Sequence, residues 1–201
     1  MMLYDLCIFA LLIILKYYLE KESIILGIDP GTTIMGYGLI KVNGSVLSLL
    51  SMGVIKLNKL ENQSLKLKKI FEKTLFLVDE YHPDILSIEA QFFGKNVQSM
   101  LKLGRAQGVA IAAALYRSVP VVEYSPRKIK QSITGNGNAS KEQVANMLTR
   151  LFNITEPQPY LDASDGLATA VCHAYQKNYV PQDKKQNTWE KFITANPERI
   201  K

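Results

Sequence analysis

Two short apolar segments that each end in a carboxylate constrain the fold of this chain most. Residues 24–28 read IILGI and are followed by Asp29, and residues 85–88 read ILSI and are followed by Glu89. Apolar runs of this length, bounded by turn residues, are typical of buried strands. A carboxylate at such a half-buried position is costly to desolvate without a partner, so we expect Asp29 and Glu89 to belong to a shared site.

The rest of the chain alternates between strand and helix patterns, which predicts an α/β domain. Further strands are expected at residues 35–42, 46–57 and 119–123, the first two joined near Asn43-Gly44 as an antiparallel hairpin. Helices are expected at residues 63–81, at 99–117, from 125, from 140 to about 152 and from about 161 to 175. The sequence therefore predicts a mixed five-stranded sheet flanked by helices.

We expect three parts along the 201 residues: an N-terminal apolar extension (1–22), a single domain (23–178) and a polar C-terminal tail (179–201). The apolar run at residues 6–15 falls well short of the roughly 20 residues that a membrane-spanning helix needs. It also lacks a basic start and a small-residue cleavage site. We expect no stable membrane insertion, and contact with a membrane surface or a partner is the alternative.

Charge and cysteine content narrow the class of function. The 24 Lys and Arg residues exceed the 18 Asp and Glu residues, giving a net charge of +6, so polyanions are expected partners. Charge alone also fits a merely soluble basic protein. Cys7 and Cys172 are far apart, which excludes a disulfide framework and a CxxC metal site and fits a reducing cytoplasm.

Asp162 and Asp165 add two more carboxylates, and their spacing turns both to one face of a helix. Taken singly, Asp162 fits a helix cap and Asp29 fits a turn. Taken together with Glu89, four carboxylates from three segments would repel one another unless cations lie among them. Oxygen ligands favour Mg²⁺ or Mn²⁺ over zinc, and two such ions catalyse attack of water on a phosphodiester. The sequence therefore predicts a metal-dependent nuclease.

Residues near these carboxylates predict contacts with DNA. The loop after Glu89 carries Phe92, Phe93 and Lys95, and we expect Phe92 to stack on an unpaired base, a contact of about 1–3 kcal/mol. A run of cations without an acid follows later in the chain, around a Gly/Asn loop, and suits a phosphate backbone. A solvated helix face is the alternative for this run. Its cations are Arg127, Lys128, Lys130 and Lys141.

Several segments, in this order, resemble the RuvC family of Holliday-junction resolvases over residues 24–178. They read ILGIDPGTTIMGYGLI, SIEAQFFGKN, LKLGRAQGVAIAAAL, SPRKIKQ and LDASDGLATAV. The resemblance implies a ribonuclease-H-like fold and a homodimer that resolves four-way junctions by paired symmetric nicks during DNA recombination and repair. It also implies two Mg²⁺ ions in each active site, with Mn²⁺ as a substitute, and a branch-migration motor complex as a partner.

The resemblance assigns roles to particular residues. The family's metal ligands correspond to Asp29, Glu89, Asp162 and Asp165. Its base-stacking aromatic residue corresponds to Phe92, and its important lysines correspond to Lys130 and Lys141. Its dimer interface corresponds to the helix around residues 101–112, which includes Leu101, Gly104 and Gly108.

Other functions share parts of this pattern. Residues 27–33 also resemble the phosphate-binding turn of actin-like ATPases and sugar kinases, but those proteins need two domains of this fold, for which the chain is too short. A ribonuclease-H-like RNA-processing nuclease shares the GIDPG start. A junction-binding module that does not cleave would have no need of the four carboxylates. The Phe92 loop and the basic run before Lys141 favour the junction endonuclease.

Overall fold

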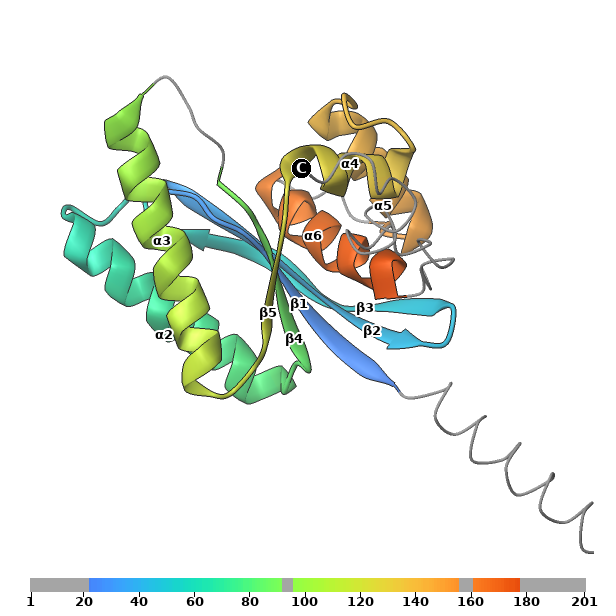
Figure 1. Cartoon of the computed structure of the whole chain (residues 1–201), viewed down its shortest axis with the longest axis horizontal. Helices are drawn as coiled ribbons and strands as arrows, with labels where there is room; N and C mark the ends of the chain where they lie inside the picture. The colour runs from blue at the N-terminus through green and yellow to red at the C-terminus, as the bar shows by residue number, and fades with distance from the viewer. Residues whose placement is uncertain (1–21, 92–95, 156–160, 178–201) are drawn as a thin grey trace, which may run out of the picture.

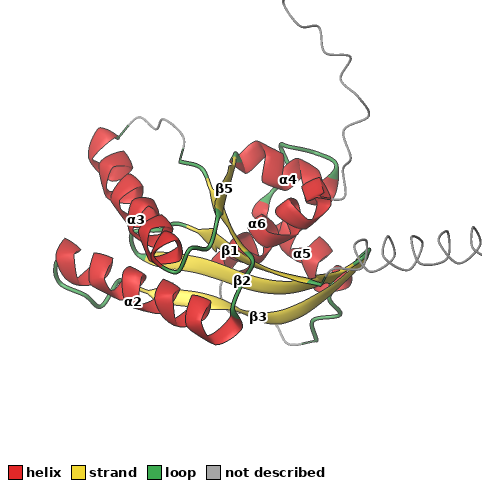
Figure 2. Ribbon diagram, turned by 60° about the horizontal axis from the view of Figure 1, so that its bottom comes forward, coloured by secondary structure: helices red, strands yellow, loops and turns green. Residues whose placement is uncertain are grey.

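The computed structural model describes residues 22–91, 96–155 and 161–177. The strands are β1 (Ser23–Asp29), β2 (Ile34–Asn43), β3 (Val46–Lys56), β4 (Ile85–Glu89) and β5 (Val121–Tyr124). The helices are α2 (Gln63–Tyr81), α3 (Val97–Tyr116), α4 (Pro126–Thr134), α5 (Lys141–Leu151) and α6 (Leu161–Lys177). The strands form one sheet in the order β3-β2-β1-β4-β5. Helices α2 and α3 cover one face, and α4, α5 and α6 cover the other (Figure 1, Figure 2).

The sheet is mixed, which confirms the prediction. The pairs β1·β2 and β2·β3 are antiparallel, and Gly44 turns the hairpin between β2 and β3 with a φ of 57°. The pairs β1·β4 and β4·β5 are parallel. Strands β1, β4 and β5 therefore all end at the same edge of the sheet.

Alternating residues of the central strands build two cores. Leu26 and Ile28 of β1 pack with the helices α2 and α3, whereas Ile25 packs with α4, α5 and α6. Strand β4 repeats the pattern, since Leu86 and Ile88 belong to the first core. Because side chains of a strand alternate between faces, the residue after Ile28 points toward the α6 side.

Helix α6 lies unusually close to the sheet because glycines face it. A Cβ atom on Gly36 of β2 would lie 1.7 Å from the carbonyl oxygen of Asp162, so any larger residue would push the start of α6 away. From the helix side, a Cβ atom on Gly166 would lie 2.5 Å from the Cα of Tyr37. The close packing holds the first turns of α6 against β2.

The helix ends follow from local capping. The side chain of Asn62 caps the start of α2 by accepting a hydrogen bond from the backbone N–H of Leu65. The helix ends at Tyr81, as predicted, and the next residue, His82, adopts a left-handed conformation (φ 46°). Ser125 caps α4 in the same way. Ser140 and Gln143 form a capping box at the start of α5.

The prediction for the fifth strand was wrong at its start. Residues 119–123 were expected, but the strand begins at Val121. The backbone N–H of Val119 donates instead to the carbonyl of Ala114 and closes the end of α3. The carbonyl of Pro120 then accepts a hydrogen bond from Leu86 and leads the chain into the sheet.

Helix α3 begins two residues before the expected 99, because the side chain of Asn96 caps it by accepting a hydrogen bond from Ser99. The other element ends differ from the prediction by two residues or fewer. Residues 1–21 of the predicted N-terminal extension, the C-terminal tail, Phe92 and Lys95 lie outside the described residues. Among the helices that the structure describes, none is long and apolar enough to cross a membrane.

Candidate metal centre

The parallel strands place Asp29 and Glu89 at neighbouring positions of one sheet edge. Asp29 is the last residue of β1 and Glu89 is the last residue of β4. The register pairs Ile28 with Ile88, so the next residue of each strand leaves the sheet at the same level. Strand alternation directs both carboxylates to the side of the sheet that α6 covers.

Helix α6 brings its two carboxylates to the same place. One oxygen each of Asp29, Asp162 and Asp165 lies within 4.8 Å of the other two, which is close enough for a shared metal ion. Glu89 lies beside this group of three, and with Asp29 and Asp165 it lines a cavity of about 170 Å³. The four acidic residues singled out in the sequence therefore meet around one region.

The walls of this cavity come from three helices and two strands. Apolar residues of α4, α5 and α6 line it together with two lysines, one from α4 and one from α5. The lining residues are Asp29, Glu89, Pro126, Ile129, Lys130, Lys141, Val144, Asp165 and Ala168. An apolar wall beside clustered carboxylates lowers the local dielectric constant and makes their repulsion stronger.

Burial and repulsion by neighbouring carboxylates raise the pKa of two of the carboxyl groups well above the usual range. Burial, followed by the charges of Glu89 and Asp165, raises the pKa of Asp29 to about 8. Burial and the charge of Asp165 raise the pKa of Glu89 to about 7. A divalent cation would offset this repulsion, and its binding would release the protons.

Lys141 provides positive charge inside the site. Its Nζ donates a hydrogen bond to Oδ2 of Asp165 over 2.5 Å. Burial opposes the charged form of Lys141, but the hydrogen bond to Asp165 and the surrounding carboxylates raise its pKa overall. The charges of Lys141 and Lys130 both lower the pKa of Glu89.

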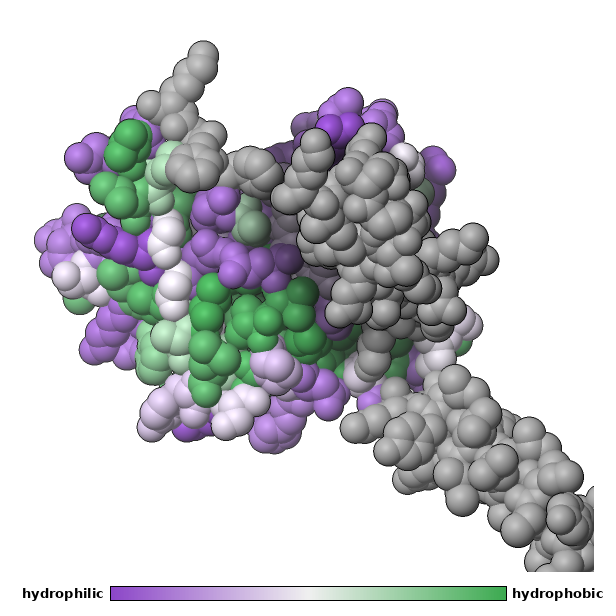
Figure 3. Space-filling view, in the orientation of Figure 1, coloured by the Kyte–Doolittle hydropathy of each residue, from purple (hydrophilic) through white to green (hydrophobic). Residues whose placement is uncertain are grey.

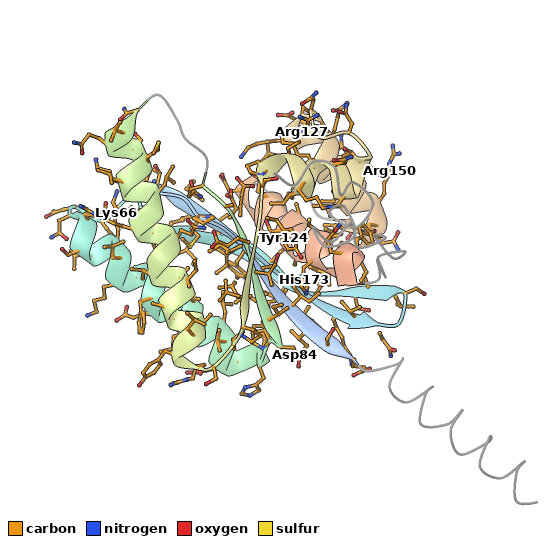
Figure 4. The ribbon with its side chains drawn as sticks, viewed as in Figure 1. Lys66, Asp84, Tyr124, Arg127, Arg150 and His173 are labelled. Atoms are coloured by element: carbon orange, nitrogen blue, oxygen red, sulfur yellow. The ribbon has the colours of Figure 1, made fainter. Side chains whose placement is uncertain are left out.

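The other cations of the basic run lie outside the cavity. Arg127 and Lys128 are exposed on α4, and Figure 4 shows Arg127 at the outer side of α4, as Arg150 is on α5. The structure therefore divides the predicted cations into two groups. Lys130 and Lys141 line the carboxylate cavity, whereas Arg127 and Lys128 face solvent.

The residues predicted to form a dimer interface are exposed on α3. Leu101 is 51% exposed, and within the described residues no neighbouring atom lies within 4 Å of a Cβ placed on Gly104 or Gly108. Figure 3 shows hydrophobic side chains at the surface over both ends of this helix, where Val97 and Leu115 are also exposed.

Two residues of the site region went unnoticed in the sequence. Lys66 of α2 donates a hydrogen bond to the carbonyl of Thr32 and holds the turn that follows Asp29. Gln107 of α3 donates to the carbonyl of Glu89 and to the carboxylate of Glu123. In the sequence, Gln107 could have been recognised as the single amide side chain within a run of small apolar residues.

Comparison with known proteins gives concordant matches. The family model described as crossover junction endodeoxyribonuclease RuvC matches residues 25–173. The chain is 58% identical to the crossover junction endodeoxyribonuclease RuvC of Christiangramia forsetii, over 92% of this chain and 97% of the relative. It is 57% identical to that of Bacteroides fragilis, over 90% of this chain and 97% of the relative.

Solved structures agree with these matches. RuvC of T. thermophilus in complex with a Holliday junction substrate superposes with a TM-score of 0.71 at 33% identity, covering 77% of this chain and 94% of that chain. The yeast mitochondrial Holliday junction resolvase has a TM-score of 0.56 at 16% identity, over 77% of this chain and 82% of its own, which indicates a shared fold. The fold is therefore ribonuclease-H-like, as the resemblance implied.

Proposed function

The chain belongs to the RuvC family and is a crossover junction endodeoxyribonuclease, and we propose that Asp29, Glu89, Asp162 and Asp165 hold its metal ions. One observation carries the assignment of the site: carboxylates from two strand ends and one helix converge beside two lysines. A site of this composition suits hydrolysis of a phosphodiester, since it can hold cations and approach an anionic strand.

The cofactor is a divalent metal, and we propose two Mg²⁺ ions, with Mn²⁺ able to substitute. The fit follows from the donors, which are all hard carboxylate oxygens. The raised pKa of Asp29 adds support, since burial and then the neighbouring carboxylates disfavour its charged form and a cation would offset both effects. When bound, the ions would supply Lewis-acid activation of water and stabilisation of the leaving oxygen.

The protein residues then hold and neutralise the reacting groups. A carboxyl group must be ionised to act as a ligand, so Asp29 and Glu89, whose pKa values are raised, release protons when the site fills. Lys141, fixed on Asp165, supplies positive charge near the anionic phosphate. Lys130 also lines the cavity and adds to this charge.

DNA contacts beyond the metal centre are proposed on two segments. Arg127 and Lys128 are exposed on α4, next to the cavity-lining Lys130, and would neutralise phosphates of a junction arm. Phe92 and Lys95, in the segment between β4 and α3, would contact an unpaired base and the backbone at the branch point. Gln91, the last described residue before this segment, lies two positions after Glu89.

We propose that the active form is a homodimer built on α3. The exposed Leu101 and the open surface at Gly104 and Gly108 would allow two copies of the helix to approach closely. A twofold dimer presents two metal centres to a junction whose strands are also related by a twofold axis. Cooperation with a branch-migration motor and a location in the cytoplasm complete the proposal.

The decisive experiment compares a synthetic four-way junction with a linear duplex of the same sequence, each with and without Mg²⁺. We expect paired nicks in opposing strands of the junction only, and only with the metal. Asp165→Asn should lose cleavage by roughly 1,000-fold or more while retaining junction binding, since it removes a proposed ligand. Glu80→Gln, at an exposed position of α2, is the matched control.

The remaining outcomes separate the alternatives. Tight binding to the junction without cutting under Mg²⁺ or Mn²⁺ would indicate a non-cleaving binding module. Cutting of structured RNA in preference to the junction would indicate an RNA-processing nuclease. Full activity of Asp165→Asn would place the metal centre elsewhere.

A further inference from the structure

Gln107 is a buried amide in a helix face made mostly of alanines. It is 9% exposed and lies on α3 beside Ala106 and Ala110, which are buried in the core. A buried amide costs free energy unless its hydrogen-bonding groups find partners. The partners of Gln107 therefore indicate why a polar side chain stands at this position.

Both hydrogen bonds of Gln107 use its Nε2 atom. Nε2 donates to Oε2 of Glu123 over 2.7 Å and to the main-chain carbonyl of Glu89 over 3.4 Å. The first bond is short and has a carboxylate acceptor, and the second is longer and weaker. Two donor hydrogens on one nitrogen are required, so an apolar side chain of the same size cannot replace them.

These bonds join α3 to the edge of the sheet where the acidic site begins. Glu89 ends β4, and Glu123 belongs to the neighbouring β5. The residue after Glu89 is held from the other side, because the N–H of Ala90 donates to the carbonyl of Tyr124 over 2.8 Å. The peptide group between Glu89 and Ala90 is therefore hydrogen-bonded on both sides. Its N–H donates to Tyr124 of β5, and its carbonyl oxygen accepts from Gln107 of α3.

We propose that Gln107 is a positioning residue that sets the direction of the Glu89 carboxylate toward the metal centre. The inference rests on the proposed role of Glu89 as a metal ligand. Rotation of the Glu89 peptide would swing the side chain relative to Asp29 and Asp165, and the bond from Gln107 resists that rotation. The short bond to Glu123 holds the amide in the orientation that this requires.

Hydrogen bonds that orient metal ligands typically change metal affinity by about 10- to 100-fold when lost. Gln107 acts through the main chain of Glu89, so we expect an effect near the lower limit, about tenfold. The effect should appear in metal affinity and in the Mg²⁺ concentration needed for half-maximal cleavage. Junction binding without metal should stay unchanged.

The test uses the full chain and measures Mn²⁺ binding by electron paramagnetic resonance in the absence of DNA. Gln107→Met keeps the size of the side chain and removes both donors, and we expect the Mn²⁺ dissociation constant to rise about tenfold. Gln107→Arg restores side-chain N–H donors, which can bond to the carboxylate of Glu123, so we expect it to recover most of the affinity. Gln176→Met makes the same substitution near the end of α6, away from Glu89, and should leave the Mn²⁺ dissociation constant unchanged.

Glu123 provides a second test that does not disturb the core, since its side chain is exposed. Glu123→Met removes the partner that orients the amide, and we expect a smaller loss of Mn²⁺ affinity than in Gln107→Met. The double variant should be no worse than Gln107→Met alone, because both changes break one chain of hydrogen bonds. Additive losses would overturn the proposal.

Two further results would also overturn it: an unchanged Mn²⁺ dissociation constant in Gln107→Met, or a Gln107→Arg variant as defective as Gln107→Met. The proposed function is judged separately by the parent chain. If the parent binds Mn²⁺ but cuts no junction, the nuclease assignment fails while the Gln107 comparison still stands.

Discussion

Lys141 and Asp165 form an ion pair between α5 and α6, with Nζ 2.5 Å from Oδ2. The capping box of Ser140 and Gln143 fixes the first turn of α5 and so places Lys141 over the carboxylates. The Asp165 side chain is only 15% exposed, which limits screening by water. The positive charge of Lys141 lowers the pKa of Asp29 and of Glu89, whereas their burial raises it.

Lys141→Met should therefore shift the pH dependence of cleavage toward higher pH. Without this cation, Asp29 and Glu89 hold their protons more strongly and compete with the metal. We also expect the rate near neutral pH to fall by roughly 100-fold or more, as when other groups that stabilise transition-state charge are removed. A pH–rate profile measures both effects. Lys69→Met on the exposed side of α2 should leave the profile in place, and an unshifted profile in Lys141→Met would refute the prediction.

The stability of the metal-free protein should decrease as pH rises. The pKa of Asp29 is about 8 in the folded state, against an ordinary value of 3.8, so the folded state binds a proton that the unfolded state releases. That stabilisation is present at low pH and is lost as pH rises to about 8. Thermal melts in a chelator should show this decline, and excess Mg²⁺ should oppose it. Asp29→Asn should make the decline shallower, leaving the contribution of Glu89, and coincident curves for the two proteins would contradict the assignment.

Gly36→Ala should displace α6 and damage the metal centre. The new Cβ atom would lie 1.7 Å from the carbonyl oxygen of Asp162, which forces the helix and both of its carboxylates outward. We expect a loss of about 1–3 kcal/mol in the free energy of unfolding, together with weaker Mn²⁺ binding. Denaturant unfolding and Mn²⁺ titration measure these effects. Gly104→Ala, where the space is open, should not destabilise the fold.

Leu101→Glu should weaken the proposed dimer. It places a charge on the exposed apolar surface of α3, where an equivalent charge from the second copy would repel it. Sedimentation velocity should show monomers at concentrations at which the parent chain is dimeric, and paired nicking should fall more than single nicking. Leu50→Glu, on the edge strand β3, makes the same exchange away from α3. A dimer that survives the change in Leu101 would require another interface.

Arg127→Gln and Lys128→Gln should each weaken junction binding in a salt-dependent way. Each substitution removes about one phosphate contact and should reduce the slope of log affinity against log salt by about 1. Fluorescence anisotropy in a chelator measures binding without cleavage. Lys59→Gln, exposed in the turn before α2, should leave the slope unchanged. An unchanged slope in the α4 variants would show that DNA passes elsewhere.

Local patterns in the sequence were sufficient to predict most of the fold. The helix at residues 63–81 was predicted with both its ends from its apolar periodicity and from Pro83, which follows it. In the structure Asn62 caps its start, a local contact that acts over a few residues. The strands that end at Asp29 and Glu89 were visible as apolar runs with a carboxylate after each. Val119 was assigned to a strand because its contact with Ala114 depends on how α3 ends.

The sequence by itself determined the types of the elements, the acidic residues and the basic run, because these depend on the order of residues along the chain. Only the tertiary structure decided that Asp29, Asp162 and Asp165 approach within 4.8 Å, that Lys141 rather than Lys128 enters the site, and that Gln107 contacts Glu89. These relations depend on the distance of α6 from the sheet and on the placement of α3 and α5. Packing between residues far apart in sequence sets those distances, so the hydrophobic periodicity of a single segment cannot predict them.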